Sequence, residues 1–259
     1  GILRGARHVT VGGRYAYVAA DAGIVVLDLD EPLAPRRVAV VPLKGARASA
    51  LQFRYLFAAD EEGLRVIDVT VPAKARLVPE ATVRLADARR IYLARTYAYV
   101  AGGREGLVVV DVERPESPRV HQRFDDEGRL DDARDVVVAT TNASAFAYVA
   151  DGVNGLKVLQ LTSPEIQPKF YGFSPEPRPR VIARRETRSP AISLAKGLDR
   201  DRGVDETGGQ IAVFGRIGSR PFTGEEQRRF YLRPDGSVWT VNDTGKPGDF
   251  RDARPAGAT

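Results

Sequence analysis

Four arginines recur at one point of a repeated pattern, and they are the side chains best placed to do chemistry in this chain. Each follows an alanine and precedes a run of strand-forming residues; they are Arg7, Arg47, Arg89 and Arg134. Guanidinium groups gathered in one place suit an anion such as a carboxylate, because each offers a planar fork of hydrogen-bond donors. We therefore predict an anion- or partner-binding ring. The alternative is that each arginine pairs with an acidic residue of its own or a neighbouring repeat.

A second recurring position carries a carboxylate at the end of a predicted strand. The residues are Asp28, Asp68 and Asp111, and the fourth repeat has Gln160 instead. An aspartate there can accept a hydrogen bond from a backbone N–H of the turn that follows. We predict this structural role, with calcium ligation as the alternative.

One further segment alternates oxygen-bearing side chains as a calcium loop does, at Asp199, Asp201 and Asp205. An EF-hand loop has a glycine at its sixth position and a glutamate at its twelfth. This segment lacks that glycine and has Gln210 at the twelfth position, and two interleaved arginines would repel a cation. A solvated loop is the simpler interpretation, with calcium as the alternative.

The arginines and aspartates belong to a unit that is written four times. An aromatic residue opens the second strand of each unit, and a glycine ends the turn after it. These glycines are Gly23, Gly63, Gly106 and Gly155, spaced 40, 43 and 49 residues apart. Each unit holds four strand candidates, which in the first are residues 8–11, 15–19, 24–29 and 37–41. Such a unit is typical of a β-propeller blade, because a small four-stranded sheet must stack on neighbours to bury its faces.

The third strand of each unit resembles the signature of the LVIVD repeat family, which is predicted to form β-propellers in bacterial and archaeal extracytoplasmic proteins. The matching strands are residues 24–28, 64–68, 107–111 and 156–160. The resemblance covers roughly residues 6–173. It implies an all-β propeller in an extracytoplasmic location (periplasmic, cell-surface or secreted), and it implies no shared catalytic activity.

We divide the chain into four blades, a linker and a C-terminal segment. The predicted blades are residues 1–45, 46–87, 88–132 and 133–173. Three alternating prolines predict an extended linker over residues 174–180. Residues 181–259 are predicted to contain a strand at 210–215, a short helix at 223–229, a hairpin at 230–241 and a loosely ordered tail. Four blades are too few to close a ring, so we expect the C-terminal segment or another chain to complete it, and the 259 residues to be a piece of something longer.

Composition narrows the classes of cofactor and partner. The chain has no cysteine, so disulfides, thiolate metal sites and covalent haem attachment are excluded within it. The net charge of +5 is spread along the chain and the aromatic residues recur at strand positions, so nucleic-acid binding is not expected. No apolar stretch is long enough to predict a membrane span. The two histidines, His8 and His121, lie in no nucleophile or metal motif, and no catalytic residue is predicted.

The functional prediction is a non-enzymatic propeller that serves as a protein-binding scaffold. The alternative is a propeller-type hydrolase or lactonase with a site at the channel mouth. The C-terminal segment also resembles the stretch that follows LVIVD propellers in some multihaem c-type cytochromes. That resemblance implies a haem-free part of an electron-transfer assembly, whose partner is a multihaem cytochrome or the rest of a larger polypeptide.

Two structural expectations follow from the repeat. The first is that small residues in register are buried where neighbouring sheets approach; they are Ala19, Ala59, Ala101 and Ala150. The second is that the four arginines converge on one shared space, since equivalent residues on innermost strands of stacked blades face a common axis.

Overall fold

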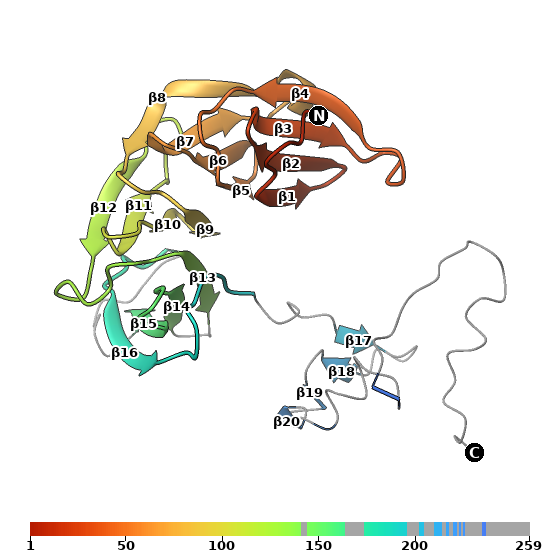
Figure 1. The fold of residues 1–259 in the computed structure, drawn as a ribbon. Helices are drawn as coiled ribbons and strands as arrows, with labels where there is room; N and C mark the ends of the chain where they lie inside the picture. The colour runs from red at the N-terminus through yellow and green to blue at the C-terminus, as the bar shows by residue number, and fades with distance from the viewer. Residues whose placement is uncertain are drawn as a thin grey trace, which may run out of the picture. The chain divides into compact units, whose positions relative to one another are not determined.

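Four consecutive sheets of four antiparallel strands form the first part of the molecule in the computed structural model (Figure 1). The structure describes residues 1–140, 144–163 and 174–195, and beyond these only 202–204, 210–213, 216–217, 220–221, 223, 225 and 235–236. The chain divides into two compact units, Gly1–Ala195 and Lys196–Thr259. The predicted all-β architecture is confirmed for the repeats.

Each sheet is a meander in which strands adjacent in sequence pair side by side. The first consists of β1 (His8–Gly12), β2 (Tyr15–Ala20), β3 (Gly23–Asp28) and β4 (Arg36–Val41). The second consists of β5 (Ala48–Gln52), β6 (Tyr55–Ala59), β7 (Gly63–Asp68) and β8 (Arg76–Arg84). The third consists of β9 (Arg90–Ala94), β10 (Tyr97–Ala101), β11 (Leu107–Asp111) and β12 (Arg119–Phe124). The fourth consists of β13 (Asp135–Thr140), β14 (Ala145–Ala150), β15 (Leu156–Thr162) and β16 (Arg180–Arg185).

The local sequence explains the hairpins. A two-residue turn joins the innermost strand of the first sheet to the second strand, and its first residue, Gly13, has a φ of 57°. Glycine adopts this left-handed conformation at no steric cost. The same turn position in the second sheet is Phe53, with a φ of 52°. Strand alternation then directs successive side chains to opposite faces of each sheet. In the described part of the first unit the only helix is η1 (Pro72–Lys74), a single short turn.

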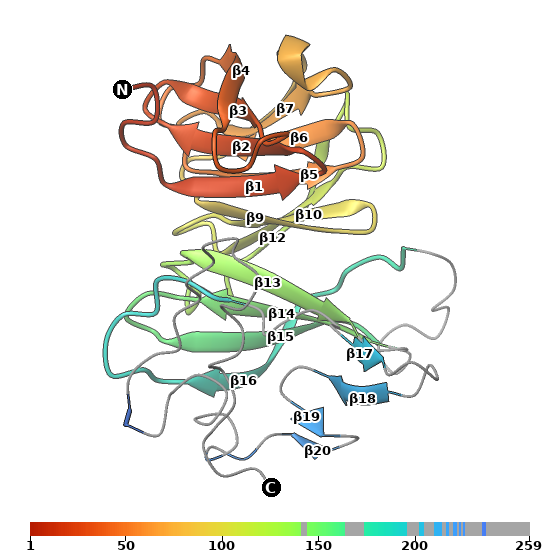
Figure 2. The same cartoon turned by 90° about the vertical axis from the view of Figure 1, so that its right-hand side faces the viewer.

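The core lies in the three interfaces between the stacked sheets. Aromatic and aliphatic side chains fill each interface, with Tyr17 between the first and second sheets, Phe57 between the second and third, and Tyr99 between the third and fourth. The four alanines in register, Ala19, Ala59, Ala101 and Ala150, are fully buried. The first three lie in the interfaces between sheets, as expected, whereas Ala150 belongs to none of these interfaces. The innermost strands β1, β5, β9 and β13 follow one another along one side of this stack (Figure 2).

One predicted boundary is wrong. The linker over residues 174–180 was expected to end the fourth blade, but Arg180 begins β16, the outer strand of the fourth sheet. The backbone N–H of Arg178 already bonds to the carbonyl of Leu161 at 2.6 Å. The prolines at 175, 177 and 179 fix an extended backbone, and extended backbone leads directly into an outer edge strand. The first unit accordingly continues to Ala195.

Among the described residues of the second unit are four short strands that form an antiparallel sheet of their own. They are β17 (Arg202–Val204), β18 (Gln210–Val213), β19 (Arg216–Ile217) and β20 (Arg220–Pro221). Strand β18 corresponds to the strand predicted at 210–215. The predicted helix at 223–229, the hairpin at 230–241 and the tail lie outside the described residues, single positions aside. Among the residues that the structure describes, no helix is long and apolar enough to span a membrane.

Candidate binding site at the inner rim

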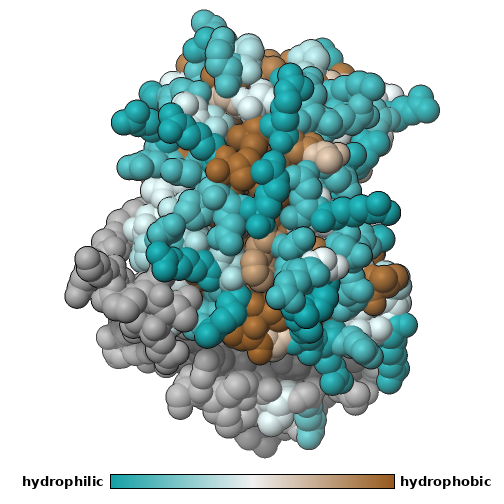
Figure 3. Space-filling view, turned by 90° about the vertical axis from the view of Figure 1, so that its left-hand side faces the viewer, coloured by the Kyte–Doolittle hydropathy of each residue, from teal (hydrophilic) through white to brown (hydrophobic). Residues whose placement is uncertain are grey.

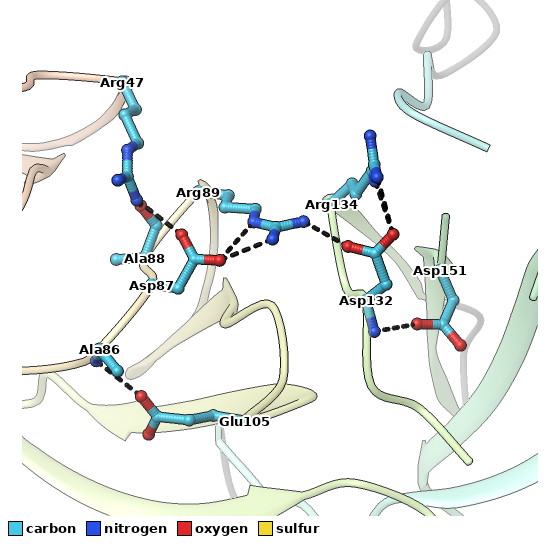
Figure 4. A network of polar contacts seen from close by, with 9 residues as sticks. All are labelled: Arg47, Ala86, Asp87, Ala88, Arg89, Glu105, Asp132, Arg134 and Asp151. Carbon is cyan, nitrogen blue, oxygen red and sulfur yellow. Dashed lines mark hydrogen bonds and ion pairs between the residues drawn. The ribbon is translucent and has the colours of Figure 1, made fainter. Parts of the chain in front are cut away.

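Three of the four predicted arginines join in one ion-pair network at the inner rim of the sheets (Figure 4). Asp87 connects the first two: its Oδ1 lies 2.8 Å from Nη1 of Arg47 and its Oδ2 lies 2.6 Å from Nη2 of Arg89. Asp132 connects the next two, with its Oδ1 2.7 Å from Nη1 of Arg89 and its Oδ2 2.8 Å from Nη2 of Arg134. The network therefore crosses two sheet interfaces.

The backbone holds these arginines at equivalent places. Each donates its backbone N–H to the carbonyl of an alanine at or next to the end of the second strand of its own sheet, at 2.8 to 2.9 Å. The pairs are Arg7 with Ala19, Arg47 with Ala59, Arg89 with Ala101 and Arg134 with Ala150. The repeated sequence thus sets the backbone position of each arginine, and neighbouring carboxylates set the position of its guanidinium group.

Arg7 stands apart from the other three. Its guanidinium bonds to Oδ1 of Asp21 at 2.8 Å and to the carbonyl of Gly5 at 2.7 Å, both within the first repeat. The expectation of four arginines in one shared space is therefore corrected to a network of three and a separate pair. Pairing with acids of the same or the adjacent repeat, the alternative raised from the sequence, describes the observed contacts.

The acidic partners were missed because they occupy two different positions of the repeat. In the third and fourth repeats the acid directly precedes Ala-Arg, as Asp87 and Asp132, and the turn after the second strand has a glycine. In the first and second repeats the turn has the acid, as Asp21 and Glu61, and a glycine precedes Ala-Arg. A Cβ added to the glycine would collide with the acid of the same repeat in all four cases; the glycines are Gly5, Gly45, Gly103 and Gly152. Every repeat thus has one acidic side chain next to this glycine, at an equivalent place in its own sheet.

The network is electrostatically coupled. Burial alone would raise the pKa of Asp132, but hydrogen bonds from Arg134 and Arg89 lower it below the usual value. Burial likewise opposes the charge on Arg89, and hydrogen bonds to Asp87 and Asp132 raise its pKa. All three arginines stay partly accessible, at 30 to 39% of the side-chain surface. Three guanidinium groups share two carboxylates, so the network carries one surplus positive charge.

The residues two places beyond each alanine lie deeper on the innermost strands. The backbone N–H of Ser49 donates to Nδ1 of His8 at 3.2 Å, which requires that nitrogen to be unprotonated. Burial, and to a lesser degree the charge of Arg90, lowers the pKa of His8 to about 4. In the fourth sheet Oδ2 of Asp135 accepts the N–H of Leu194 at 2.8 Å, and burial raises the pKa of Asp135. His8 thus ties the first sheet to the second, and Asp135 ties β13 to the segment that follows β16.

The strand-end aspartates hold the turns that follow them. Oδ1 accepts a backbone N–H two residues ahead in each case, at 2.9 to 3.0 Å. The pairs are Asp28 with Asp30, Asp68 with Thr70 and Asp111 with Glu113. This is the structural role that the sequence analysis expected.

The remaining candidates do not assemble a site among the residues described. Asp199, Asp201 and Asp205 lie outside those residues. Asp126, in the acidic stretch that precedes Asp132, pairs with Arg129 and with Arg184 of β16. His121 lies 3.6 Å from Glu176 and stacks edge-on against Tyr97. Within the described part of the chain, no three His, Cys, Asp or Glu side chains group closely enough to hold a metal ion.

The stacked sheets and their repeated rim define a β-propeller repeat module. The LVIVD repeat model matches residues 4–38, 86–126 and 132–163, so the chain carries LVIVD repeats. The second repeat lies between these matches, and its sheet has the same strand order as the others. No curated protein matches the chain.

Three solved structures are similar to this chain. The β-propeller domain of Cps50 (Swd1) from Myceliophteria thermophila is similar with a TM-score of 0.50 and 13% identity, over 69% of this chain and 57% of that domain. The computationally designed protein Ika8 is similar with a TM-score of 0.47 and 12% identity, over 73% of this chain and 51% of that one. Apo AztD from Citrobacter koseri is similar with a TM-score of 0.41 and 14% identity, over 73% of this chain and 49% of that one. This chain therefore spans about half the length of these neighbours. At 13% identity, the similarity to the Cps50 domain shows the fold alone.

Proposed function

We propose that this chain is a non-enzymatic β-propeller module that binds an acidic segment of a protein partner at its inner rim. The single observation that supports this is the ion-pair network, in which Arg47, Arg89 and Arg134 share the two carboxylates Asp87 and Asp132. A carboxylate of a partner would balance the surplus guanidinium charge. Charge-assisted bonds of this kind are short and directional, which suits specific recognition.

Arg134 is the position where a partner carboxylate fits best. It ends the network, it bonds to one carboxylate where Arg89 bonds to two, and 39% of its side chain is accessible. Its N–H bond to Ala150 and its two bonds to Asp132 hold the guanidinium in place before any partner arrives. Binding then costs little side-chain entropy.

The absence of catalysis belongs to this proposal. The described histidines serve in structural contacts. Although burial opposes it, hydrogen bonds from Arg134 and Arg89 lower the pKa of Asp132, which makes this carboxylate a poor general acid. An extracytoplasmic location is proposed on the resemblance of the repeats. The comparisons with known proteins do not bear on a multihaem cytochrome assembly, so that setting stays a prediction from the sequence.

A labelled acidic peptide tests the proposal directly. We expect fluorescein-labelled hexaglutamate to bind the full chain in fluorescence anisotropy, and its affinity to fall as salt rises because the contacts are exposed charges. Arg134→Gln should weaken binding about tenfold, the equivalent of about 1.4 kcal/mol. Arg37→Gln is the matched control, since Arg37 is exposed on the outer strand β4, away from the rim. Equal losses in the two variants, or no binding by the parent chain, would refute an acidic-partner site at the rim.

A further inference from the structure

One face of the first sheet has the character of a sheet interface, and no other sheet of the described part of the first unit lies upon it. Strand alternation points Thr10 of β1 toward the second sheet, where its hydroxyl bonds to the carbonyl of Ser49 at 2.8 Å. Val9 and Val11 point the other way, and they are 55% and 61% exposed. Beneath them Val18, Ala20 and Val25 form a small buried cluster of their own.

The repeat shows what covers this face elsewhere. The residues equivalent to Val9 and Val11 in the later sheets all pack toward the preceding sheet and are buried or half-buried. They are Ser49 and Leu51 in β5, Ile91 and Leu93 in β9, and Val136 and Val138 in β13. On the side of the outer strands, by contrast, hydrophilic residues dominate and apolar residues form separate patches (Figure 3).

The charges at the rim point to the same kind of neighbour. Asp87 and Asp132 each use Oδ2 for the arginine of their own repeat and Oδ1 for the arginine of the preceding sheet. The carboxylate of Asp21 occupies the equivalent place in the first sheet and uses only Oδ1, for Arg7 of its own repeat. Its side chain is 48% exposed, and no ion pair to its other oxygen is present among the described residues.

We propose that the Val9–Val11 face of the first sheet is a docking surface for a propeller sheet of a partner. That sheet would present an apolar face with a central aromatic residue, as Tyr17, Phe57 and Tyr99 do at the existing interfaces. Its innermost strand would begin with an arginine that binds the free oxygen of Asp21. The surface continues the apolar packing that the molecule uses at three interfaces, and the ion-pair bridge that it uses at two of them.

A second copy of this chain fits the face less well. The complementary face would be the far side of the fourth sheet, and the chain itself already lies along the inner edge of that sheet. Ala191 and Gly152 exchange two backbone hydrogen bonds, at 2.8 and 3.1 Å, as Ala133 and Gly103 do at the preceding interface. Self-association is therefore an alternative that the experiment must separate.

Cysteine labelling of an extended chain provides the test. The chain has no cysteine, so a single Val9→Cys variant reports on this face alone. The probe is the full chain in which a copy of residues 46–86 replaces residues 1–4 ahead of Gly5. The copy supplies a sheet of the required kind, with its own Arg47 placed to meet Asp21 where it normally meets Asp87.

We expect a thiol reagent to label Val9→Cys about tenfold more slowly in the extended chain than in the parent, because covered sites react only through opening. Val153→Cys is the control, since Val153 is 75% exposed in a turn of the fourth sheet; its labelling should not change. Asp21→Asn, or Arg47→Gln in the copy, should restore part of the labelling.

Two results would overturn the proposal. The first is unchanged labelling of Val9→Cys in two extended chains, the one that has the copy of residues 46–86 and one that has a copy of residues 88–131 in the same place. The second extended chain guards against a failure specific to one repeat. The second is protection of Val9→Cys in the unextended chain that grows with protein concentration, because a second copy would then be the occupant.

Discussion

Replacing Asp132 by asparagine should loosen the interface between the third and fourth sheets. The carboxylate accepts bonds from Nη1 of Arg89 at 2.7 Å and from Nε and Nη2 of Arg134 at 2.9 and 2.8 Å. Hydrogen bonds to charged groups contribute about 1.5–3 kcal/mol each when buried. The Asp132 side chain is 23% exposed, so solvent reduces these values. We expect the variant to lose about 2 kcal/mol of unfolding free energy, or about 4–8 °C in Tm for a unit of this size.

The matched control is Asp131→Asn. Asp131 is the neighbouring acid, it is exposed, and it accepts one bond from the amide of Asn154. That variant should change the free energy of unfolding by less than about 0.5 kcal/mol. Thermal unfolding followed by circular dichroism compares the two, and hydrogen exchange locates the loss to β9 and β13.

The pH dependence gives a second check on Asp132. The pKa of Asp132 is lower in the folded chain than its ordinary value of about 3.9. Its stabilisation is therefore fully present above that ordinary value and is lost as pH falls through the folded pKa. The gap between parent and Asp132→Asn should close at low pH. If Asp132→Asn and Asp131→Asn behave alike at neutral pH, or if a double-mutant cycle with Arg89→Gln shows no coupling, the carboxylate does not bridge the sheets.

Three further results are expected. Ala101→Leu should overpack the interface between sheets and cost about 1–3 kcal/mol, measured by denaturant unfolding against Ala183→Leu on the exposed strand β16; equal costs would show that Ala101 is not confined. Lys157 and Asp151 form a buried ion pair, so Asp151→Ala should cost about 3–5 kcal/mol of unfolding free energy by leaving a lone buried charge. Adding Lys157→Val should recover most of this loss, because the first repeat has Ala20 and Val25 at these positions. A double variant no more stable than Asp151→Ala would contradict this. The pKa of His8 falls from 6.5 to about 4 on folding, so its neutral form stabilises the fold above about pH 6.5 and this stabilisation declines as pH falls toward about 4. The Tm of His8→Gln should therefore change less with pH in this window than the Tm of the parent chain. Identical pH profiles of Tm would exclude His8 as the cause.

The repeat made most of the fold predictable. Strands expected at residues 8–11 and 15–19 appear as His8–Gly12 and Tyr15–Ala20, because alternation and turn residues are local signals. The buried alanines followed from register alone. The outer strand β16 was missed because a proline-rich stretch of the kind expected in a linker precedes it, and because its residues, such as Arg184 and Arg185, are exposed and polar. Only its pairing partner β15 specifies it as a strand.

The site was half predictable. The arginines share one sequence position in every repeat, so comparison of the repeats found them. Their carboxylates come from two positions, one ahead of Ala-Arg and one in the next turn, and these meet only after the hairpin folds. The sequence nonetheless contains a signal, because an acid at one of the two positions goes with a glycine at the other. Asp87 precedes Ala-Arg where Gly103 is in the turn, and Gly5 precedes Ala-Arg where Asp21 is in the turn.

The exchange of acid and glycine also limits how these repeats can recombine. A crossover inside the hairpin that joined Asp132 of the fourth repeat to Glu61 of the second would place two carboxylates at a point with room for one. The reciprocal product, with Gly45 and Gly152, would have no carboxylate there, and a neighbouring arginine would lose a counter-charge. Crossovers between repeats keep the rim intact only when the strand start and the following turn travel together. The heritable unit of this propeller is therefore the complete inner hairpin, from the residue before Ala-Arg to the turn after the second strand.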